Sequence, residues 1–391
     1  MGKTTNVNLV EEVKKLLSIE SITGNEKELA YYLLDRFKSI GCKTTLFEAA
    51  PGRFNITAVI EGSKPGKLGL LFHGHLDTVP AYNMENPFSP YEVDGRIHGR
   101  GSVDQKGGLA AVFAAFAAYK DSGKRPEKSV GFVGVIDEES EHRGSMALKE
   151  MGIDADFAVV TEPTALRLGI GCKGTAPIRI EVRGRPAHGC RPWLGVNAVL
   201  AGMEITRELM DETLPECTIE GIGKVKASWN LGRIEGGDVY NIVAEKCSIW
   251  FDRRLIPGET QEQIHKRVSK LVDKYNSTNN ITVSAEISRP DWNWDPIKKR
   301  GLLPALTEIN SKIVEHVKKA HNNIIGNDPV IFFTDGYQEM DFLVNDLGIE
   351  SIQYGPGDSS LCHTDHEQLS ISDLESCSEV YLELIRLICE K

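Results

Sequence analysis

The chain of 391 residues is long enough for two or three domains, and its 41% hydrophobic and 26% charged residues are ordinary for a soluble globular protein. Its formal net charge of −11 argues against nucleic acid and anionic membrane surfaces as partners. A membrane-spanning apolar run, the apolar core of a signal peptide and a C-x-x-C pair are all missing from the sequence, so we expect a cytoplasmic protein with reduced thiols.

Helical and strand patterns alternate through the first half of the chain. Residues 25–40 carry apolar side chains at helical spacing, with Asn25 in position to cap the helix. A second, more apolar helix is expected near residues 108–119, after a glycine-rich stretch. Short apolar runs typical of buried strands lie at residues 55–60, 68–72, 129–136 and 156–161. Because helices separate these strands, we expect an α/β fold whose catalytic domain has a mainly parallel sheet with helices on both faces.

The strand at residues 68–72 leads into a turn that presents His75 and Asp77. Residues two apart on an extended chain point to the same side, so the carboxylate can touch the imidazole. A carboxylate that fixes one ring nitrogen is typical of a metal-binding histidine. The alternative is a strand-end turn with a solvated histidine and a capping aspartate.

Acidic residues follow the next strands, namely Glu138 with Glu139, and then Glu162. Open α/β sheets bind their ligands at such strand ends. Asp104 precedes the apolar helix and can equally be an N-cap without chemistry. Together with His363 near the C-terminus, these side chains suit a divalent metal such as zinc, cobalt or manganese. One carboxylate among them can bridge two ions.

The pattern changes after residue 174. Half-exposed alternation at 178–183 indicates a strand of a different sheet, and it is followed by a helix, two strands, a helix and a strand. The expected ranges are 196–210, 225–234, 240–252, 260–275 and 281–287. This βαββαβ order is that of a ferredoxin-like unit. We therefore place an inserted dimerisation or lid domain at 175–290, whose sheet edge can pair with a second subunit.

The remaining chain returns to the first domain, which we place at 1–174 and 291–391. A helix is expected at 302–319, strands at 330–333 and 349–354, and a last helix beginning at Ser372 or Asp373.

Five short segments, in order along nearly the whole chain, resemble the motifs of the M20 metallopeptidases. They are G-H-L-D-T-V-P at 74–80, G-R-G-S-V-D-Q-K at 99–106, D-E-E at 137–139, T-E-P at 161–163 and H-T-D-H-E at 363–367. That family includes acetylornithine deacetylase, succinyl-diaminopimelate desuccinylase, aminoacylase and glutamate carboxypeptidase. The resemblance implies two divalent metal ions as cofactors, zinc first and cobalt as the other possibility.

The resemblance also implies the two ligand sets. One metal would be held by His75, Asp104 and Glu162, and the other by Asp104, Glu139 and His363, with Asp104 bridging. The peptide bond after the bridging aspartate would be cis. Two other histidines compete for the ligand positions, but the spacings G-H-x-D and H-x-x-x-E favour His75 over His73 and His363 over His366.

Three catalytic or substrate-binding roles follow from the same resemblance. Asp77 would orient His75, and Glu138 would be the general base and later the proton donor. His188, in G-R-P-A-H-G, would stabilise the oxyanion, reaching across from the partner subunit.

Asn241 and Arg254 match residues that bind the substrate's carboxylate. A salt-bridged surface arginine is the alternative for Arg254, and a plain turn residue is the alternative for His188.

Three functions remain open from the sequence. The first is a dinuclear-metal amidohydrolase that cleaves the amide bond of small N-acyl amino acids with a metal-bridging water and a glutamate base. The second is a carboxypeptidase or dipeptidase acting on short peptides by the same chemistry. The third is a catalytically silent member that uses the fold for binding. The expected partners are a small substrate and a second copy of the chain, which would form a homodimer through the inserted domain.

Overall fold

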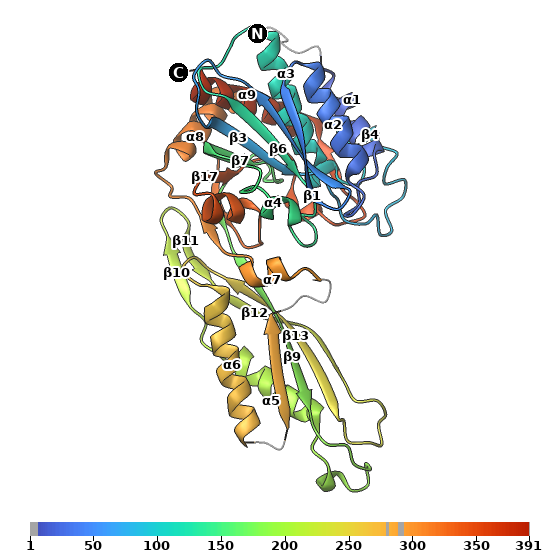
Figure 1. Cartoon of the computed structure of the whole chain (residues 1–391). Helices are drawn as coiled ribbons and strands as arrows, with labels where there is room; N and C mark the ends of the chain where they lie inside the picture. The colour runs from blue at the N-terminus through green and yellow to red at the C-terminus, as the bar shows by residue number, and fades with distance from the viewer. Residues whose placement is uncertain (1–6, 279–280, 288–292, 391) are drawn as a thin grey trace. The chain divides into compact units, whose positions relative to one another are not determined.

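The computed structural model describes residues 7–278, 281–287 and 293–390. The chain divides into two compact units, each visible in Figure 1. Unit 1 comprises Met1–Gly171, Leu306–Thr334 and Glu339–Lys391, and unit 2 comprises Cys172–Ala305 and Asp335–Gln338. Unit 2 therefore runs beyond the boundary placed at residue 290 and includes a short segment from much later in the chain.

Unit 1 is built on a nine-stranded sheet with the order β1-β2-β6-β3-β7-β17-β8-β15, in which β16 pairs with β8. The strands are β1 (Lys43–Ala50), β2 (Arg53–Ile60), β3 (Leu68–His75), β6 (Val130–Val135), β7 (Ala155–Val160), β8 (Leu168–Cys172), β15 (Ala305–Leu306), β16 (Ile331–Thr334) and β17 (Glu350–Gln353). The central strands β6, β3, β7 and β17 run parallel, whereas β1 pairs with β2, β2 with β6, and β8 with β17 in antiparallel orientation. The α/β class expected from the sequence is confirmed.

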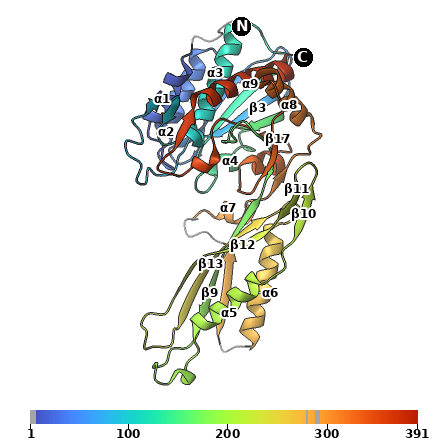
Figure 2. The ribbon, with the colours of Figure 1, turned by 180° about the vertical axis from the view of Figure 1, so that it is seen from behind.

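Aromatic side chains join the helices of unit 1 to the central strands. The helices are α1 (Leu9–Ser18), α2 (Lys27–Ser39), α3 (Gly107–Asp121), α4 (Arg143–Met146), α8 (Lys312–Ile325) and α9 (Ile371–Cys389). Phe72 of β3 contacts Phe116 of α3 and Tyr381 of α9, and Phe37 of α2 stacks on Phe132 of β6. All five rings are buried. The helices α3 and α9 thus cover one face of the sheet, side by side in both views (Figures 1 and 2).

The register of the central strands brings their carboxyl ends to one edge. His75, the last residue of β3, is paired with Val135 at the end of β6, and His73 is paired with Val160 at the end of β7. Side chains that follow these three strands must therefore lie near one another.

A small antiparallel sheet holds two loops of unit 1 together. It has the order β18-β5-β4, with β4 (Tyr91–Val93), β5 (Arg96–His98) and β18 (Gln368–Ser370). The chain continues from β5 into the segment η1 (Ser102–Lys106), in which Asp104 and Gln105 have non-helical backbone angles, and β18 follows the loop that carries His363. Two further turns of unit 1 are η3 (Phe342–Asp346) and η4 (Ser359–Leu361).

Unit 2 is an antiparallel four-stranded sheet of order β12-β13-β9-β14 with a two-stranded hairpin, β10-β11. Its elements are β9 (Gly174–Arg183), η2 (Pro192–Leu194), α5 (Ala198–Met210), β10 (Glu216–Ile219), β11 (Gly223–Lys226), β12 (Ser228–Gly236), β13 (Lys246–Leu255), α6 (Gln261–Thr278), β14 (Thr282–Ile287) and α7 (Asp295–Arg300). Alternate residues of β9 and β13 are buried against α5 and α6. The βαββαβ order holds, with the hairpin as an addition between α5 and β12.

Some local expectations are wrong. Glu26, not Asn25, is the N-cap residue of α2, and Ser370 caps α9 through its hydroxyl. The helix expected at 302–319 begins only at Lys312, because the preceding residues form β15 and a turn. Among the described residues, no helix combines the length and the apolar character needed to cross a membrane.

Candidate metal centre

His75 lies at the carboxyl end of β3 with only 1% of its surface exposed. Its Nδ1 is 2.8 Å from the main-chain carbonyl oxygen of Asp77. If Nδ1 donates to that carbonyl, Nε2 is left with a lone pair. Nε2 lies 3.0 Å from Oδ1 of Asp104 and 3.8 Å from Oε1 of Glu162. The ring is therefore fixed in an orientation that aims one nitrogen at two carboxylates.

The carboxylate of Asp77 accepts hydrogen bonds from other residues and not from the ring of His75. Oδ1 accepts the N–H of Glu138 at 3.0 Å, and Oδ2 accepts the N–H of Glu139 at 3.1 Å and the hydroxyl of Thr23 at 2.8 Å. The closest approach of the carboxylate to Nδ1 of His75 is 3.6 Å. Burial raises the pKa of Asp77 to about 7. Asp77 thus touches His75 mainly through its backbone, while its side chain anchors the two glutamates.

Asp104 lies in η1, directly before α3. It does not cap that helix, because the N-cap position is Lys106 and no side chain accepts a hydrogen bond there. The Asp104–Gln105 peptide bond is cis, as the resemblance implies. Burial alone would raise the pKa of Asp104, but hydrogen bonds from His363 and His75 outweigh it and lower the pKa.

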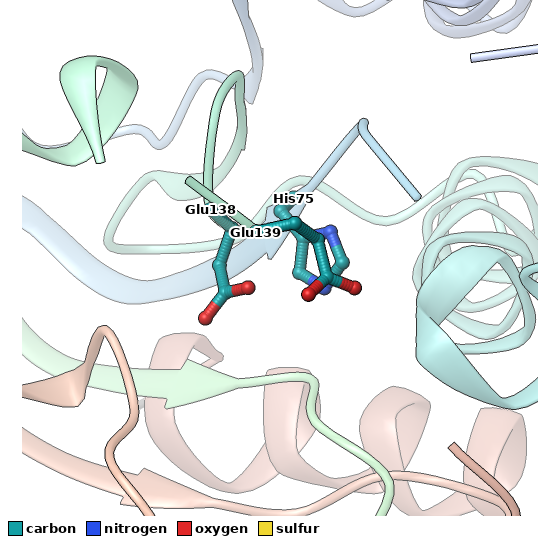
Figure 3. Close-up of side chains that lie close together, drawn as sticks. All are labelled: His75, Glu138 and Glu139. Atoms are coloured by element: carbon teal, nitrogen blue, oxygen red, sulfur yellow. The ribbon is translucent and has the colours of Figure 1, made fainter. Parts of the chain in front are cut away.

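Glu138 and Glu139 follow β6, after Asp137 with its positive φ of 72°. The carboxylates of both glutamates and the ring of His75 each offer one atom within 4.8 Å of the others (Figure 3). Burial raises the pKa of Glu138 well above its usual value, and the repulsion from Glu139 and Glu162 adds to this, while His75 opposes it.

Glu162 and His363 complete the cluster. Glu162 follows β7, and its carboxylate accepts a hydrogen bond from the side chain of Gln105. Burial, followed by repulsion from Asp104, raises the pKa of Glu162 well above its usual value. His363 approaches from the loop before β18, with Nε2 at 3.1 Å from Glu139 and 3.4 Å from Asp104. Hydrogen bonds to Asp104 and Glu139 raise the pKa of His363 to about 10.

Three groups of these side chains could each hold a cation: His75, Glu138 and Glu139; His75, Asp104 and Glu162; and Asp104, Glu139 and His363. The last two share Asp104 and are the two ligand sets implied by the resemblance. In each, one atom per residue lies within 4.8 Å of the others. Neither His73 nor His366 belongs to such a group among the described residues.

The chemistry of this donor set fits divalent cations. Four carboxylates lie close together in a mostly buried place, and buried anions are costly unless positive charge compensates them. Imidazole nitrogen and carboxylate oxygen are ligands that zinc and cobalt accept. Burial is the first cause of the raised pKa values of Glu138 and Glu162, and repulsion between neighbouring carboxylates adds to it; a bound cation would relieve that repulsion, as protonation does.

Glu339 is a buried residue beside this cluster that no sequence pattern predicts. It is 1% exposed, and its Oε1 lies 3.1 Å from Nδ1 of His142, which stands 197 residues earlier in the chain. Its Oε2 lies 3.7 Å from Nε2 of His73. Besides the larger effect of burial, the charge of Glu339 contributes to the raised pKa of Glu138. A contact this distant in sequence leaves no periodic pattern to detect.

The remaining predicted site residues lie in unit 2. His188 is exposed, and its Nδ1 accepts the N–H of Cys190 at 3.1 Å. Asn241 is exposed in the neighbouring loop, where its carbonyl accepts the N–H of Gly189 at 2.7 Å. The fold of unit 2 therefore brings the backbones of these two loops together.

Arg254 stands on β13, and its Nε donates to Oδ2 of Asp252 at 2.9 Å. About a third of its side chain, 32%, is exposed. The adjacent Arg253 is fully buried and bonded to Glu259 at 2.6 Å, so Arg254 is the more accessible of the two.

Comparisons with known proteins show to which family the chain belongs. Residues 71–387 match the model of the peptidase family M20/M25/M40. The protein YgeY of Escherichia coli K12 is 27% identical over 97% of this chain and 94% of its own length. An acetylornithine deacetylase of Myxococcus xanthus is 30% identical over 88% of this chain and 86% of its own.

Two solved structures share the fold. A tripeptidase from Staphylococcus aureus has a TM-score of 0.80 at 23% identity and covers 98% of this chain and 99% of its own. A dinuclear metal-binding peptidase of family M20 from Bacillus subtilis has a TM-score of 0.71 at 13% identity and covers 98% of each chain. With the family model matching most of its length, this chain belongs to the peptidase family M20/M25/M40, whose members are hydrolases that act on amide or peptide bonds.

Proposed function

We propose that the protein is a dinuclear-metal amidohydrolase that cleaves the amide bond of small N-acyl amino acids, in the manner of acetylornithine deacetylase or succinyl-diaminopimelate desuccinylase. The observation that carries this proposal is the pair of ligand groups that share Asp104. The similarity to the Myxococcus deacetylase over most of both chains supports the substrate class.

Two divalent cations, zinc first and cobalt as the alternative, would complete the site. His75, Asp104 and Glu162 would hold one, and Asp104, Glu139 and His363 would hold the other. Bound there, the cations would supply Lewis acidity, lowering the pKa of a water molecule and polarising the substrate carbonyl. The description of the Bacillus relative as a dinuclear metal-binding peptidase supports this number of ions.

Glu138 is the general base of the proposed reaction. Its carboxylate would take a proton from the attacking water as the oxygen–carbon bond forms. It would return that proton to the amine nitrogen as the carbon–nitrogen bond breaks. Its backbone is anchored by Asp77, and its raised pKa brings its proton affinity closer to neutral pH than that of an exposed glutamate.

His188, Asn241 and Arg254 would bind the substrate from unit 2. Because Nδ1 of His188 accepts a hydrogen bond, the proton of the neutral ring lies on Nε2, which can then donate to a developing oxyanion. The fork of Arg254 can bind both oxygens of a substrate carboxylate in place of Asp252.

A homodimer formed through unit 2 is part of the same proposal. Large apolar side chains are exposed on α5 and β12, namely Leu200 at 58%, Met203 at 56%, Met210 at 46% and Ile234 at 42%. Three of these residues lie on α5, and exposed apolar residues gathered on one helix commonly mark an interface. A second copy of the chain would remove them from water and would allow His188 to act across the interface.

A peptidase acting on short peptides is the second candidate. The likeness to the Staphylococcus tripeptidase favours it. A catalytically silent member of the fold is the third.

A metal and substrate assay separates these candidates. The zinc-loaded and cobalt-loaded proteins would be analysed for bound metal and then tested for amine release from N-acetyl and N-succinyl amino acids and from di- and tripeptides. We expect about two metal ions per chain and amine release from N-acyl amino acids. Release from peptides alone would identify a peptidase, and inactivity on every amide would favour the silent member.

The Glu138→Gln variant is the control for catalysis in this assay. It should keep its metal but lose turnover by about 10²–10⁴-fold, the usual contribution of a general base. Turnover close to that of the unchanged protein would remove Glu138 from this role.

A further inference from the structure

Glu367 is a buried carboxylate that binds four donors from one short segment. Only 1% of its surface is exposed. Its Oε2 accepts Nη1 of Arg100 at 2.8 Å and the N–H of Gly101 at 2.9 Å. Its Oε1 accepts the N–H of Val103 at 2.8 Å and the N–H of Asp104 at 3.0 Å. Each oxygen therefore has two partners, and the buried negative charge is fully satisfied.

The contacts of Glu367 connect two segments that carry metal-ligand candidates. Its donors lie in the segment that ends at Asp104, and Glu367 itself follows His363 in the same loop. The pairing of β18 with β5 begins at the next residue, Gln368, which is paired with His98. The carboxylate thus lies where the two loops first come together.

Arg100 extends this connection to a third segment. Its guanidinium is buried, and its Nη2 donates to the carbonyl of Ala81 at 3.4 Å. The N–H of Arg100 donates to the carbonyl of Pro87 at 2.9 Å. The stretch from Ala81 to Pro87 follows the turn of His75 and Asp77, so the pair Arg100–Glu367 lies between three ligand-bearing segments.

We propose that Glu367 is a positioning residue of the metal centre, which holds Asp104 at the correct distance from His363 without contacting a cation itself. Asp104 is the residue common to both ligand groups, so a shift of its backbone would disturb both. This inference rests on the proposed function, because it assumes that the two groups bind cations.

Replacement of Glu367 by Gln tests the charge and both acceptors at once. The amide has one oxygen and one NH₂ group. Whichever way it is placed, the NH₂ group faces two donors, either Arg100 and Gly101 or Val103 and Asp104. Two donors then lose their acceptor, and the segment must move to relieve the contact.

A matched control is available in Glu12, another buried carboxylate of unit 1. Glu12 is 5% exposed, accepts hydrogen bonds from Nε and Nη2 of Arg36 and from the hydroxyl of Tyr32, and takes part in no candidate metal group among the described residues. Glu12→Gln breaks a buried pair with an arginine, as Glu367→Gln does, but the donors that Glu12 accepts belong to α2 and not to a segment with a metal-ligand candidate.

The experiment is a titration of the metal-free full chain with cobalt. Calorimetry measures the affinity, and the visible absorption of the bound cobalt reports its surroundings. We expect Glu367→Gln to bind cobalt about 10–100-fold more weakly, with a changed absorption spectrum, as is usual when a partner of a ligand is altered. Glu12→Gln should lose thermal stability but keep the affinity and spectrum of the unchanged protein. Equal affinity and equal spectra for Glu367→Gln and the unchanged protein would overturn the inference while leaving the proposed function intact.

Two milder variants keep the test decisive if Glu367→Gln does not fold. Glu367→Asp retains two acceptor oxygens on a shorter arm, and Arg100→Lys retains a positive charge without the guanidinium fork. Both should give intermediate losses of cobalt affinity, and unchanged affinity in both would refute the role of Glu367. Failure of the unchanged protein to bind cobalt at all would instead overturn the proposed function, and this inference with it.

Discussion

His75 and His363 both approach the carboxylate of Asp104, but in different surroundings. His75 is buried and contacts oxygen through both ring nitrogens, whereas half of the His363 side chain, 50%, is exposed. His363 is nevertheless close to two carboxylates, which stabilise its protonated form. A histidine that binds a metal must be neutral, so these carboxylates stabilise a proton on His363 when no cation is bound and stabilise the cation when it is bound.

Proton release should therefore accompany metal binding. The pKa of His363 is raised to about 10, so its ring is protonated in the metal-free protein at pH 8, and the pKa of His75 is also raised above its usual value. Zinc binding at this pH should release about one proton per chain from His363, and zinc affinity should rise with pH. Calorimetry in buffers of different ionisation enthalpy measures this number directly. His363→Ala should release about one proton fewer, and an unchanged number would contradict the assignment.

The same raised pKa has a consequence for the stability of the metal-free protein. A histidine whose pKa is higher in the folded state stabilises the fold fully below its unfolded pKa, near 6.5, and this contribution is lost as the pH rises towards 10. Metal-free protein should thus lose part of its thermal stability between these pH values. Zinc-loaded protein should lack this pH-dependent loss, because its His363 carries no proton and the contribution is absent from the start.

At the scale of elements, the end of β7 and the start of α3 are packed so closely that only glycine fits between them. A Cβ atom on Gly108 would lie 2.5 Å from the carbonyl oxygen of Thr161. Thr161 precedes Glu162, and its hydroxyl donates to the side chain of Gln105 at 2.6 Å. The helix therefore sets the position of a ligand-bearing strand end by direct contact.

Gly108→Ala should destabilise the protein for this reason. Overpacking of this kind costs about 1–3 kcal/mol, which exceeds the gain of about 1 kcal/mol that alanine brings to a helix. Urea denaturation should show a lower free energy of unfolding, and metal affinity should fall because Thr161 is displaced. Gly232→Ala is the control, since a Cβ there meets nothing closer than 3.8 Å. A more stable Gly108→Ala variant would show that the contact relaxes freely.

The central elements could be predicted because their sequence patterns are strong. The strands β3, β6 and β7 consist mainly of apolar residues, and polar residues of the site lie at or just after their ends. By contrast, β1 is half exposed and carries few apolar residues, so its pattern is weak. The chain at 225–234 appears continuous in sequence but is divided between β11 and β12.

The hydrogen-bond partners of the candidate site residues were harder to predict than the identities of these residues. The motifs identify Asp77 and Asp104, but they do not indicate that the Asp77 carboxylate binds the backbone of Glu138. Glu339 and Arg100 could not be found either, because their partners lie far away in sequence. Residue types at strand ends are local information, whereas hydrogen bonds between loops depend on the whole fold.

At the scale of the whole molecule, the predicted site residues are divided between the two units. The metal-ligand candidates and Glu138 belong to unit 1, and His188, Asn241 and Arg254 belong to unit 2. In the proposed homodimer, His188 would be supplied by another subunit, and the exposed apolar residues of α5 are available for its interface.

Mixing two inactive variants tests this arrangement. Glu138→Gln removes the base, and His188→Ala removes the oxyanion donor, so each variant alone should be nearly inactive although both keep their metal. In a hybrid dimer, the subunit that retains Glu138 can receive His188 only from its partner. If equal amounts exchange subunits freely, half of the dimers are hybrids and one of their two sites works, which gives about a quarter of the unchanged activity. A histidine that acts within its own subunit restores nothing, because no single chain in the mixture carries both groups.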